Sequence, residues 1–121
     1  MEQAVVDIQR VRVNDAAALF AAAEQASADA VSALIARAAV NVVPTITAAA
    51  IRYRTPARGT VTAIPTLARH DDTVTADLRV KGRASLGVSV DLVDEAGSHV
   101  AVAEFAWLLR ATDGERGANA A

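Results

Sequence analysis

The sequence predicts an α+β domain in which one long helix lies on a curved antiparallel sheet. Two patterns carry this prediction. One is an almost unbroken alanine-rich stretch over residues 14–38, and the other is a pair of apolar segments near the C-terminus, joined by a turn that contains Gly97. Apolar residues make up 53% of the 121 residues, but aromatic residues only 3%. Because alanine and valine each bury little surface, we expect a thin core that is completed against a second chain.

The N-terminal part of the chain contains the predicted helix and one strand before it. Residues 4–13 are β-branched and partly alternating, which indicates a strand. Asn14 or Asp15 can then accept hydrogen bonds from the first free N–H groups of the helix. The helix is expected to end at about Arg37 or Ala38, where the alanine-rich pattern stops.

Three further segments follow the helix. Residues 45–54 are rich in threonine and isoleucine and predict a strand. Residues 60–69 predict another strand, at a sheet edge or a bulge, because Pro65 has no N–H group to donate. Residues 71–82 are ambiguous, since their apolar residues alternate as in a strand, whereas two aspartates at the start and Gly82 at the end are typical of a short helix. We favour a strand there.

The clearest hairpin lies at the C-terminal end. Residues 85–92 alternate between apolar and small or polar side chains, and a turn with Gly97 follows. The return strand, residues 99–110, is apolar on both faces apart from Glu104. A strand of this kind is covered on both faces. We expect the long helix on one side and a neighbouring chain or a second layer on the other.

Length, charge and composition exclude several classes of protein. A chain of this length forms one domain, which we place at residues 1–111, with residues 112–121 as a disordered tail. The net charge is −2 and there is no basic run, so neither a nucleic acid nor an anionic membrane is expected as a partner. Charged residues interrupt the long helix and no signal peptide is recognisable, so we expect a soluble, cytoplasmic protein. The chain has no cysteine, and His70 and His99 lack a spaced carboxylate partner, so no metal site is expected.

One carboxylate on the predicted helix is the main candidate for function. Projected at 100° per residue, Glu24 falls within the main apolar face of the helix. That face consists of Phe20, Ser27, Val31, Leu34 and Ile35, whereas the opposite face carries Gln25, Asp29 and Ser32. A carboxylate on a packing face is costly to bury unless something pairs with it. Two interpretations remain open: catalysis, and a structural ion pair with an arginine of a neighbouring strand or subunit.

Three stretches of the chain carry a family resemblance. They are ALFAAAEQAS at 18–27, AIRYRTPARG at 50–59 and KGRASLGVSVDLVDEAGSHVAVAEFAWLLR at 81–110. In this order and spacing they resemble hotdog-fold proteins, and within them the acyl-CoA thioesterases. The resemblance implies a curved sheet of about five strands wrapped around one long helix. It also implies homo-oligomers, either dimers that pair their sheets edge to edge or dimers of dimers, with the active site at the dimer interface.

The resemblance also implies roles for individual residues. Glu24 takes the place of the helix carboxylate that acts as nucleophile or general base. The first helical turn, Asp15 to Ala17, takes the place of the N–H groups that polarise the thioester carbonyl. Many relatives have a His-Gly or Gly-Gly pair where this chain has Asp15-Ala16-Ala17. Glycine allows a closer approach to a ligand than alanine, and an aspartate at a helix start can cap the N–H groups that an oxyanion needs.

Other residues are expected to contact the substrate. We expect Phe20, Thr45 and Thr47 beside the acyl group, and Arg58 and Arg83, each next to a glycine, on the phosphates of CoA. No metal or redox cofactor is implied, and the CoA thioester is the substrate or ligand. The expected function is hydrolysis of a small or medium acyl, or aryl, thioester. The alternatives are a non-catalytic hotdog protein that binds acyl-CoA and a purely structural module.

Overall fold

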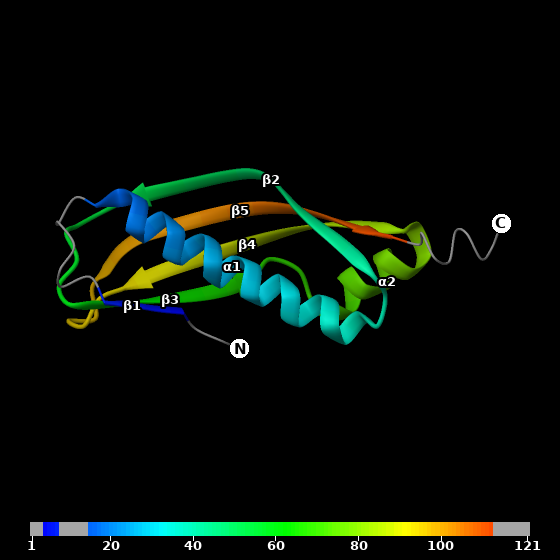
Figure 1. Ribbon diagram of the computed structural model, residues 1–121, viewed down its shortest axis with the longest axis horizontal. Coiled ribbons are helices and arrows are strands. Elements are labelled where there is room, and N and C mark those ends of the chain that lie inside the picture. The colour runs from blue at the N-terminus through cyan, green and yellow to red at the C-terminus, as the bar shows by residue number, and fades with distance from the viewer. Residues whose placement is uncertain (1–3, 8–14, 113–121) are drawn as a thin grey trace.

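The predicted α+β architecture is confirmed by a computed structural model, which describes residues 4–7 and 15–112. Five strands form one antiparallel sheet in the order β1-β3-β4-β5-β2, and α1 lies across the inner face of this curved sheet (Figure 1). In chain order the elements are β1 (Ala4–Asp7), α1 (Ala16–Ala38), β2 (Val42–Tyr53), β3 (Thr60–Leu67), α2 (Asp71–Lys81), β4 (Arg83–Val93) and β5 (His99–Ala111). The expected strand beyond Asp7 and the expected tail beyond Thr112 lie outside the described residues.

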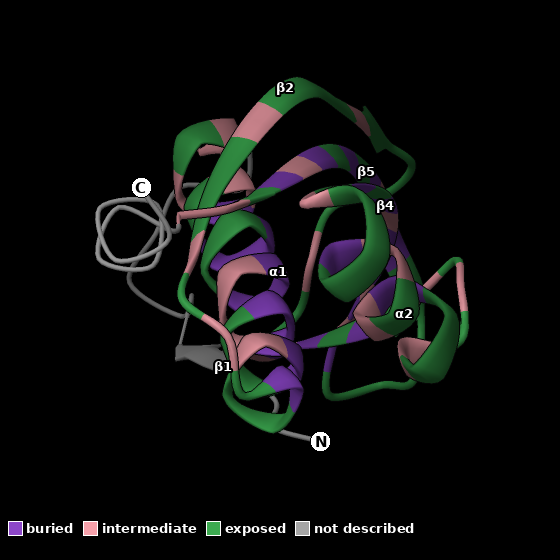
Figure 2. Cartoon of the chain, turned by 90° about the vertical axis from the view of Figure 1, so that its right-hand side faces the viewer, coloured by how far each residue is buried: buried purple, intermediate pink, exposed green. Residues whose placement is uncertain are grey.

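The long helix forms where the sequence predicts it. Asp15 is the N-cap, and its Oδ1 accepts a hydrogen bond from the N–H of Ala18 at 3.1 Å. The alanine-rich interior favours a helix, because alanine has the highest helix propensity. The C-cap is Ala39, and Arg79 of α2 donates to the carbonyl of Ala38 at 3.0 Å. The buried residues of α1 form a stripe that faces the sheet (Figure 2).

A buried hydrogen bond joins α1 to the middle of the sheet. Nε1 of Trp107 on β5 donates to Oγ of Ser27 at 2.7 Å, and Ser27 is fully buried. Beside this pair, the rings of Phe20 and Phe105 pack with their centroids 5.7 Å apart. The buried residues of α1 between these two contacts are all alanine, so the helix backbone lies close to the strands. The helix is therefore held by close packing and by one directional bond.

The sheet has a buried inner face and an outer face that is open in the described part of the chain. On β5, Phe105 and Leu109 are buried, whereas Glu104 and Ala106, on either side of Phe105, are exposed. β2 is an edge strand that pairs with β5 alone and is exposed along most of its length (Figure 2). The register of this pair shifts at Thr47, which forms a bulge. The described residues therefore cover β5 only on the face towards α1, and the predicted cover on its other face is absent among them.

Pro65 lies within β3, which is flanked by β1 and β4 and so is not an edge strand. The described residues of β1 pair only with residues 60–63 of β3 and stop before Pro65. Pro65 itself pairs with Val90 of β4. Its missing N–H group is therefore tolerated at a point where the described part of β1 offers no partner.

The prediction of a strand over residues 71–82 is wrong, because this segment is the helix α2. His70 caps its N-terminus, where Nδ1 accepts from the N–H of Asp72, and Gly82 ends it in the left-handed conformation at φ +77°. Val74 and Leu78 are buried and lie one turn apart. Their spacing of four residues fits a strand and a helix equally well, and the capping residues at both ends decide for the helix.

The buried carboxylate of Asp94 joins two loops at one end of the sheet through hydrogen bonds. Asp94, in the turn between β4 and β5, accepts hydrogen bonds from the N–H groups of Arg58, Ala96 and Ser98 at 2.9–3.0 Å. Burial alone raises the pKa of Asp94, but these three bonds and the charge of Arg58 outweigh it and hold the pKa below its ordinary value of 3.8. Asp94 therefore links the β2–β3 loop to the β4–β5 turn as an ionised group.

Replacing Ser27 with alanine is expected to destabilise the protein by about 1–3 kcal/mol, because the indole N–H of Trp107 then stays buried without an acceptor. Urea unfolding followed by the fluorescence of Trp107, the one tryptophan of the chain, measures the loss. Ser32→Ala, at an exposed position of the same helix, is the matched control and should change stability little. Equal effects of the two substitutions would show that the buried bond contributes nothing.

Replacing Asp94 with asparagine is expected to destabilise the fold at pH 7. Because the folded pKa lies below the unfolded value of about 3.8, the ionised carboxylate stabilises the fold above that value. This stabilisation is lost as the pH falls through the folded pKa. The free energies of unfolding of wild type and variant, measured in urea from pH 7 to pH 2.5, should therefore converge on the acid side. Asp72→Asn, at a side chain that is 91% exposed, is the control. A gap that does not narrow at low pH would contradict this account.

Candidate functional site

Glu24 lies on the exposed side of α1, so its predicted place on the packing face is wrong for the single chain. The large apolar residues do not mark the centre of the buried face, because alanines such as Ala23, Ala26 and Ala30 form much of it. Glu24 lies at the margin of this face, beside the exposed Ala21. Among the described residues it has no hydrogen bond or ion pair. The structural alternative, a pair with an arginine of the same chain, therefore has no support there.

The first turn of α1 presents two N–H groups that the helix itself does not use. The carboxylate of Asp15 accepts a hydrogen bond from the N–H of Ala18. Helical geometry leaves the N–H groups of Ala16 and Ala17 without an acceptor inside the helix. The hydroxyl of Tyr53, at the end of β2, donates to the carbonyl of Ala16 at 3.1 Å. Sequence reasoning did not assign this contact to Tyr53. Its only signal is the position of Tyr53 at the end of a strand that runs back to the start of the helix.

Glu24 and this first turn lie on the same helix. Seven residues separate Ala17 from Glu24, which corresponds to about 10 Å along the helix axis. Because helical side chains lean towards the N-terminus, the carboxylate of Glu24 extends part of the way back. The arrangement offers N–H donors at one end and a carboxylate at the other, and the exposed Ala21 lies on the helix surface between them.

The three residues that were expected beside the acyl group do not lie together in the structure. Phe20 lies one turn from Glu24, but its half-buried ring packs on Phe105 in the core. Thr45 pairs with Leu108 on the outer face of the sheet, so its side chain lies on the opposite side of the sheet from α1 and Glu24. Thr47 sits in the bulge of β2, and its hydroxyl donates to the carbonyl of Ala106 at 3.2 Å.

The two arginines that were expected to bind the phosphates of CoA lie at opposite ends of the sheet. Arg58 is in the loop after β2, at the end where α1 begins. Arg83 begins β4 and pairs with Arg110 at the other end. The length of β4 separates them by about 30 Å, so one chain does not place both on the same phosphates. Arg58 is the one that lies towards the first turn of α1.

Two histidines lie in separate surface clusters. The ring of His70 and the carboxylates of Asp71 and Asp72 have ligand atoms within 4.8 Å of one another. Nδ1 of His70 already accepts the N–H of Asp72 as part of the helix cap, so this cluster has a structural role. His99 contacts Asp91 at 2.7 Å on the surface. Neither cluster lies beside Glu24.

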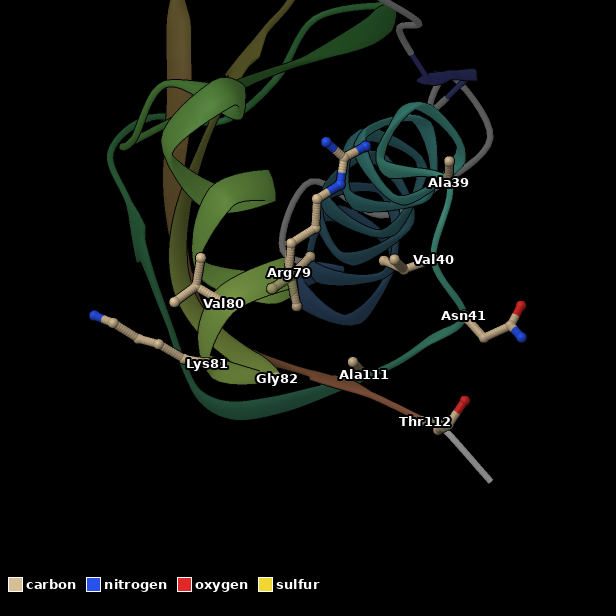
Figure 3. Close-up of a pocket in the computed structure, with 10 residues that line it drawn as sticks. Ala39, Val40, Asn41, Arg79, Val80, Lys81, Gly82, Ala111 and Thr112 are labelled. Carbon is tan, nitrogen blue, oxygen red and sulfur yellow. The ribbon is translucent and has the colours of Figure 1, made fainter. Parts of the chain in front are cut away.

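A cavity of about 700 Å³ lies between the C-terminal ends of α1 and α2 and the end of β5 (Figure 3). Arg79 extends across it to the carbonyl of Ala38, and Lys81 lies 3.7 Å from Asp77. The two cations thus neutralise a helix terminus and a carboxylate. The cavity lies at the opposite end of α1 from the free N–H groups of the first turn.

A family model described as a domain of unknown function, DUF4442, matches residues 3–109. The chain belongs to the DUF4442 family. No curated protein matches it. In the described part of this DUF4442 chain, no helix is long and apolar enough to cross a membrane.

Solved structures share the fold. A protein from Pseudomonas aeruginosa, described as of unknown function and a probable thioesterase, is 19% identical with a TM-score of 0.71, over 91% of this chain and 76% of that one. A protein of unknown function from Chlorobaculum tepidum is 14% identical with a TM-score of 0.75, over 89% and 75%. A thioesterase enzyme from Staphylococcus aureus is 12% identical with a TM-score of 0.62, over 91% and 88%. This DUF4442 chain therefore has the hotdog fold of these proteins.

Proposed function

We propose that this chain is a thioesterase that hydrolyses an acyl-CoA with a small or medium acyl group, or an aryl group. The observation that carries the proposal is that α1 carries both Glu24 and the N–H groups of Ala16 and Ala17, which have no acceptor inside the helix. The hotdog fold supports it, since some structural relatives are described as thioesterases. Neither the substrate nor a role for Glu24 follows from the fold alone.

The proposed reaction is attack by water on the thioester carbon. Glu24 accepts a proton from the water as its oxygen bonds to the carbon, and the carbonyl oxygen becomes an oxyanion that accepts from the N–H groups of Ala16 and Ala17. The intermediate collapses with cleavage of the carbon–sulfur bond. The proton held by Glu24 passes to the departing thiolate, which leaves a carboxylic acid and free CoA. The separation of about 10 Å within one helix favours this water-mediated route over direct attack by Glu24.

Tyr53 supports the oxyanion donors in this scheme. The carbonyl of Ala16, which accepts from Tyr53, belongs to the same peptide unit as the N–H of Ala17. A hydrogen bond to the carbonyl polarises that peptide unit and makes its N–H a stronger donor. It also holds the first turn of α1 to the end of β2.

We further propose that two copies pair along the free edges of β2. β2 pairs with β5 alone, and beside it the exposed side of α1 carries Ala17, Ala21 and Glu24. A second copy would supply hydrogen-bond partners to the unpaired strand edge and would bury the exposed apolar surface. Burial of Glu24 in such a dimer would exclude bulk water from it. In this arrangement Arg58, at the end where α1 begins, is the candidate for a CoA phosphate.

One observation favours a second function, that of a protein which binds acyl-CoA without hydrolysing it. The carboxylate of Asp15 lies at the start of α1 and accepts from Ala18, which places negative charge next to the proposed oxyanion site. Ala16 and Ala17 also carry side chains where glycine allows closer approach.

Replacing Glu24 with glutamine is expected to keep the fold and to reduce kcat by at least about 100-fold, because the general base is lost. The measurement is thiol release from short-, medium- and aryl-acyl-CoAs. Asp29→Asn makes the same chemical change five residues along α1 and should leave turnover unchanged. Turnover that survives in the Glu24 variant would remove this residue from the mechanism. Binding of acyl-CoA by both proteins without turnover would favour the binding function.

Replacing Tyr53 with phenylalanine removes only the hydroxyl. The expected result is a fall in kcat of about tenfold with little change in KM, because the lost hydrogen bond acts on the oxyanion donors and not on substrate binding. Thermal unfolding serves as the control for the fold. A rise in KM at constant kcat would instead place Tyr53 in substrate binding.

A further inference from the structure

The β2–β3 loop (residues 54–59) carries one exposed residue, Arg58, whose backbone is bound on both sides by the β4–β5 turn (residues 94–98). The N–H group of Arg58 donates to Oδ2 of Asp94 at 3.0 Å, and its carbonyl accepts from the N–H group of Glu95 at 3.2 Å. The backbone of an exposed loop is usually mobile. Among the described residues, the guanidinium group of Arg58 makes no hydrogen bond or ion pair. The fold thus fixes the backbone of Arg58 and leaves its side-chain donors available to a ligand.

The side chain of Glu95 holds the residues that follow Arg58. Oε2 of Glu95 accepts from the N–H group of Thr60 at 3.2 Å, where β3 begins. Gly59 lies against this carboxylate with φ +74°, and a Cβ atom at position 59 would lie 2.5 Å from Cδ of Glu95. Glycine allows both the left-handed backbone and the close approach. The end of the loop is therefore shaped to receive the Glu95 side chain, although Glu95 itself is exposed.

The same loop lies at the end of the molecule where α1 begins (Figure 1). Tyr53, the residue before the loop, donates to the carbonyl of Ala16 at 3.1 Å. Five residues of chain span at most about 18 Å, so the backbone of Arg58 lies within that distance of Tyr53. The loop is thus tied to the first turn of α1 at its start and to the β4–β5 turn at its end.

We propose that Asp94 and Glu95 are positioning residues that hold Arg58 in place to bind a phosphate group of CoA. This role rests on the proposed function of the site, in which Arg58 contacts a CoA phosphate. Binding costs less when the loop that carries the binding group is already ordered. If the two carboxylates only joined the loop to the turn, their loss would lower stability without weakening the binding of CoA in particular.

Glu95→Ala tests the positioning role with CoA itself as the probe. The substitution removes the acceptor of the Thr60 N–H group. It is expected to raise the Kd for CoA, measured by titration calorimetry, about fivefold, which corresponds to the cost of ordering one side chain. Pantetheine, which lacks the phosphates, should bind wild type and variant equally. Glu95→Gln keeps an oxygen acceptor and should restore the wild-type Kd. Asp72→Ala, at a side chain that is 91% exposed, is the control and should leave binding unchanged.

Asp94→Asn gives a second test at the other side of Arg58. Oδ1 of Asp94 accepts from the N–H groups of Ala96 and Ser98, and Oδ2 accepts from the N–H group of Arg58. The amide oxygen of asparagine can keep the two bonds within the turn, whereas its NH₂ group cannot accept from Arg58. We therefore expect the same selective rise in the Kd for CoA, measured at a temperature at which circular dichroism shows the variant folded.

A double-variant cycle separates positioning from the CoA contact itself. Arg58→Ala is expected to raise the Kd for CoA at least about tenfold. Adding Glu95→Ala to it should change nothing more, because Glu95 acts through Arg58. These titrations hydrolyse no thioester, so their outcome does not depend on thioesterase activity.

Two kinds of result would overturn the proposal, and they differ in what they say about the proposed function. A wild-type protein that does not bind CoA, or an Arg58→Ala variant that binds it as wild type does, would remove the CoA contact of Arg58 as well. Weaker binding by Arg58→Ala with unchanged binding by Glu95→Ala and Asp94→Asn, or additive effects in the double variant, would overturn the positioning role alone.

Discussion

The hydrogen bond between Trp107 and Ser27 fixes the rotation of α1 on the sheet, and the position of the candidate site depends on that rotation. The two atoms lie 2.7 Å apart in the core. Three residues along a helix turn its surface by about 300°, so Glu24 points about 60° away from Ser27. With Ser27 held against β5, Glu24 comes to the margin of the buried face. It is therefore exposed in the single chain.

The small residues of α1 explain why one directional bond matters so much. A helix face of large side chains interlocks with a sheet and resists rotation, whereas an alanine face packs closely but smoothly. The hydrogen bond between Trp107 and Ser27 sets the rotation of α1 on the sheet, which the alanines do not. The same small residues leave a thin core, and they leave the edge of β2 and the outer face of the sheet exposed. These two surfaces of the sheet are therefore uncovered in the described part of the chain.

The sequence predicted the parts of the fold that rest on local pattern. The long helix and the final hairpin follow from periodicity, the Asp15 cap and the glycine turn. The α2 segment was missed because Val74 and Leu78, four residues apart, fit both periods. The inward placement of Glu24 was wrong because alanine does not mark a face by hydrophobicity. The contact of Tyr53 with the first turn of α1 joins distant segments, and no local pattern encodes it.

The central claim is that Glu24 and the first turn of α1 act on one thioester. A crystal structure with an acyl-CoA analogue whose sulfur is replaced by a methylene group, so that it resists hydrolysis, tests this most directly. The account predicts the carbonyl oxygen of the analogue within hydrogen-bond distance of the N–H groups of Ala16 and Ala17. It also predicts that a single water molecule lies between the carboxylate of Glu24 and the carbonyl carbon, and that this site lies at an interface between two chains. An analogue bound elsewhere, or a Glu24 that still faces open solvent in the complex, would contradict it.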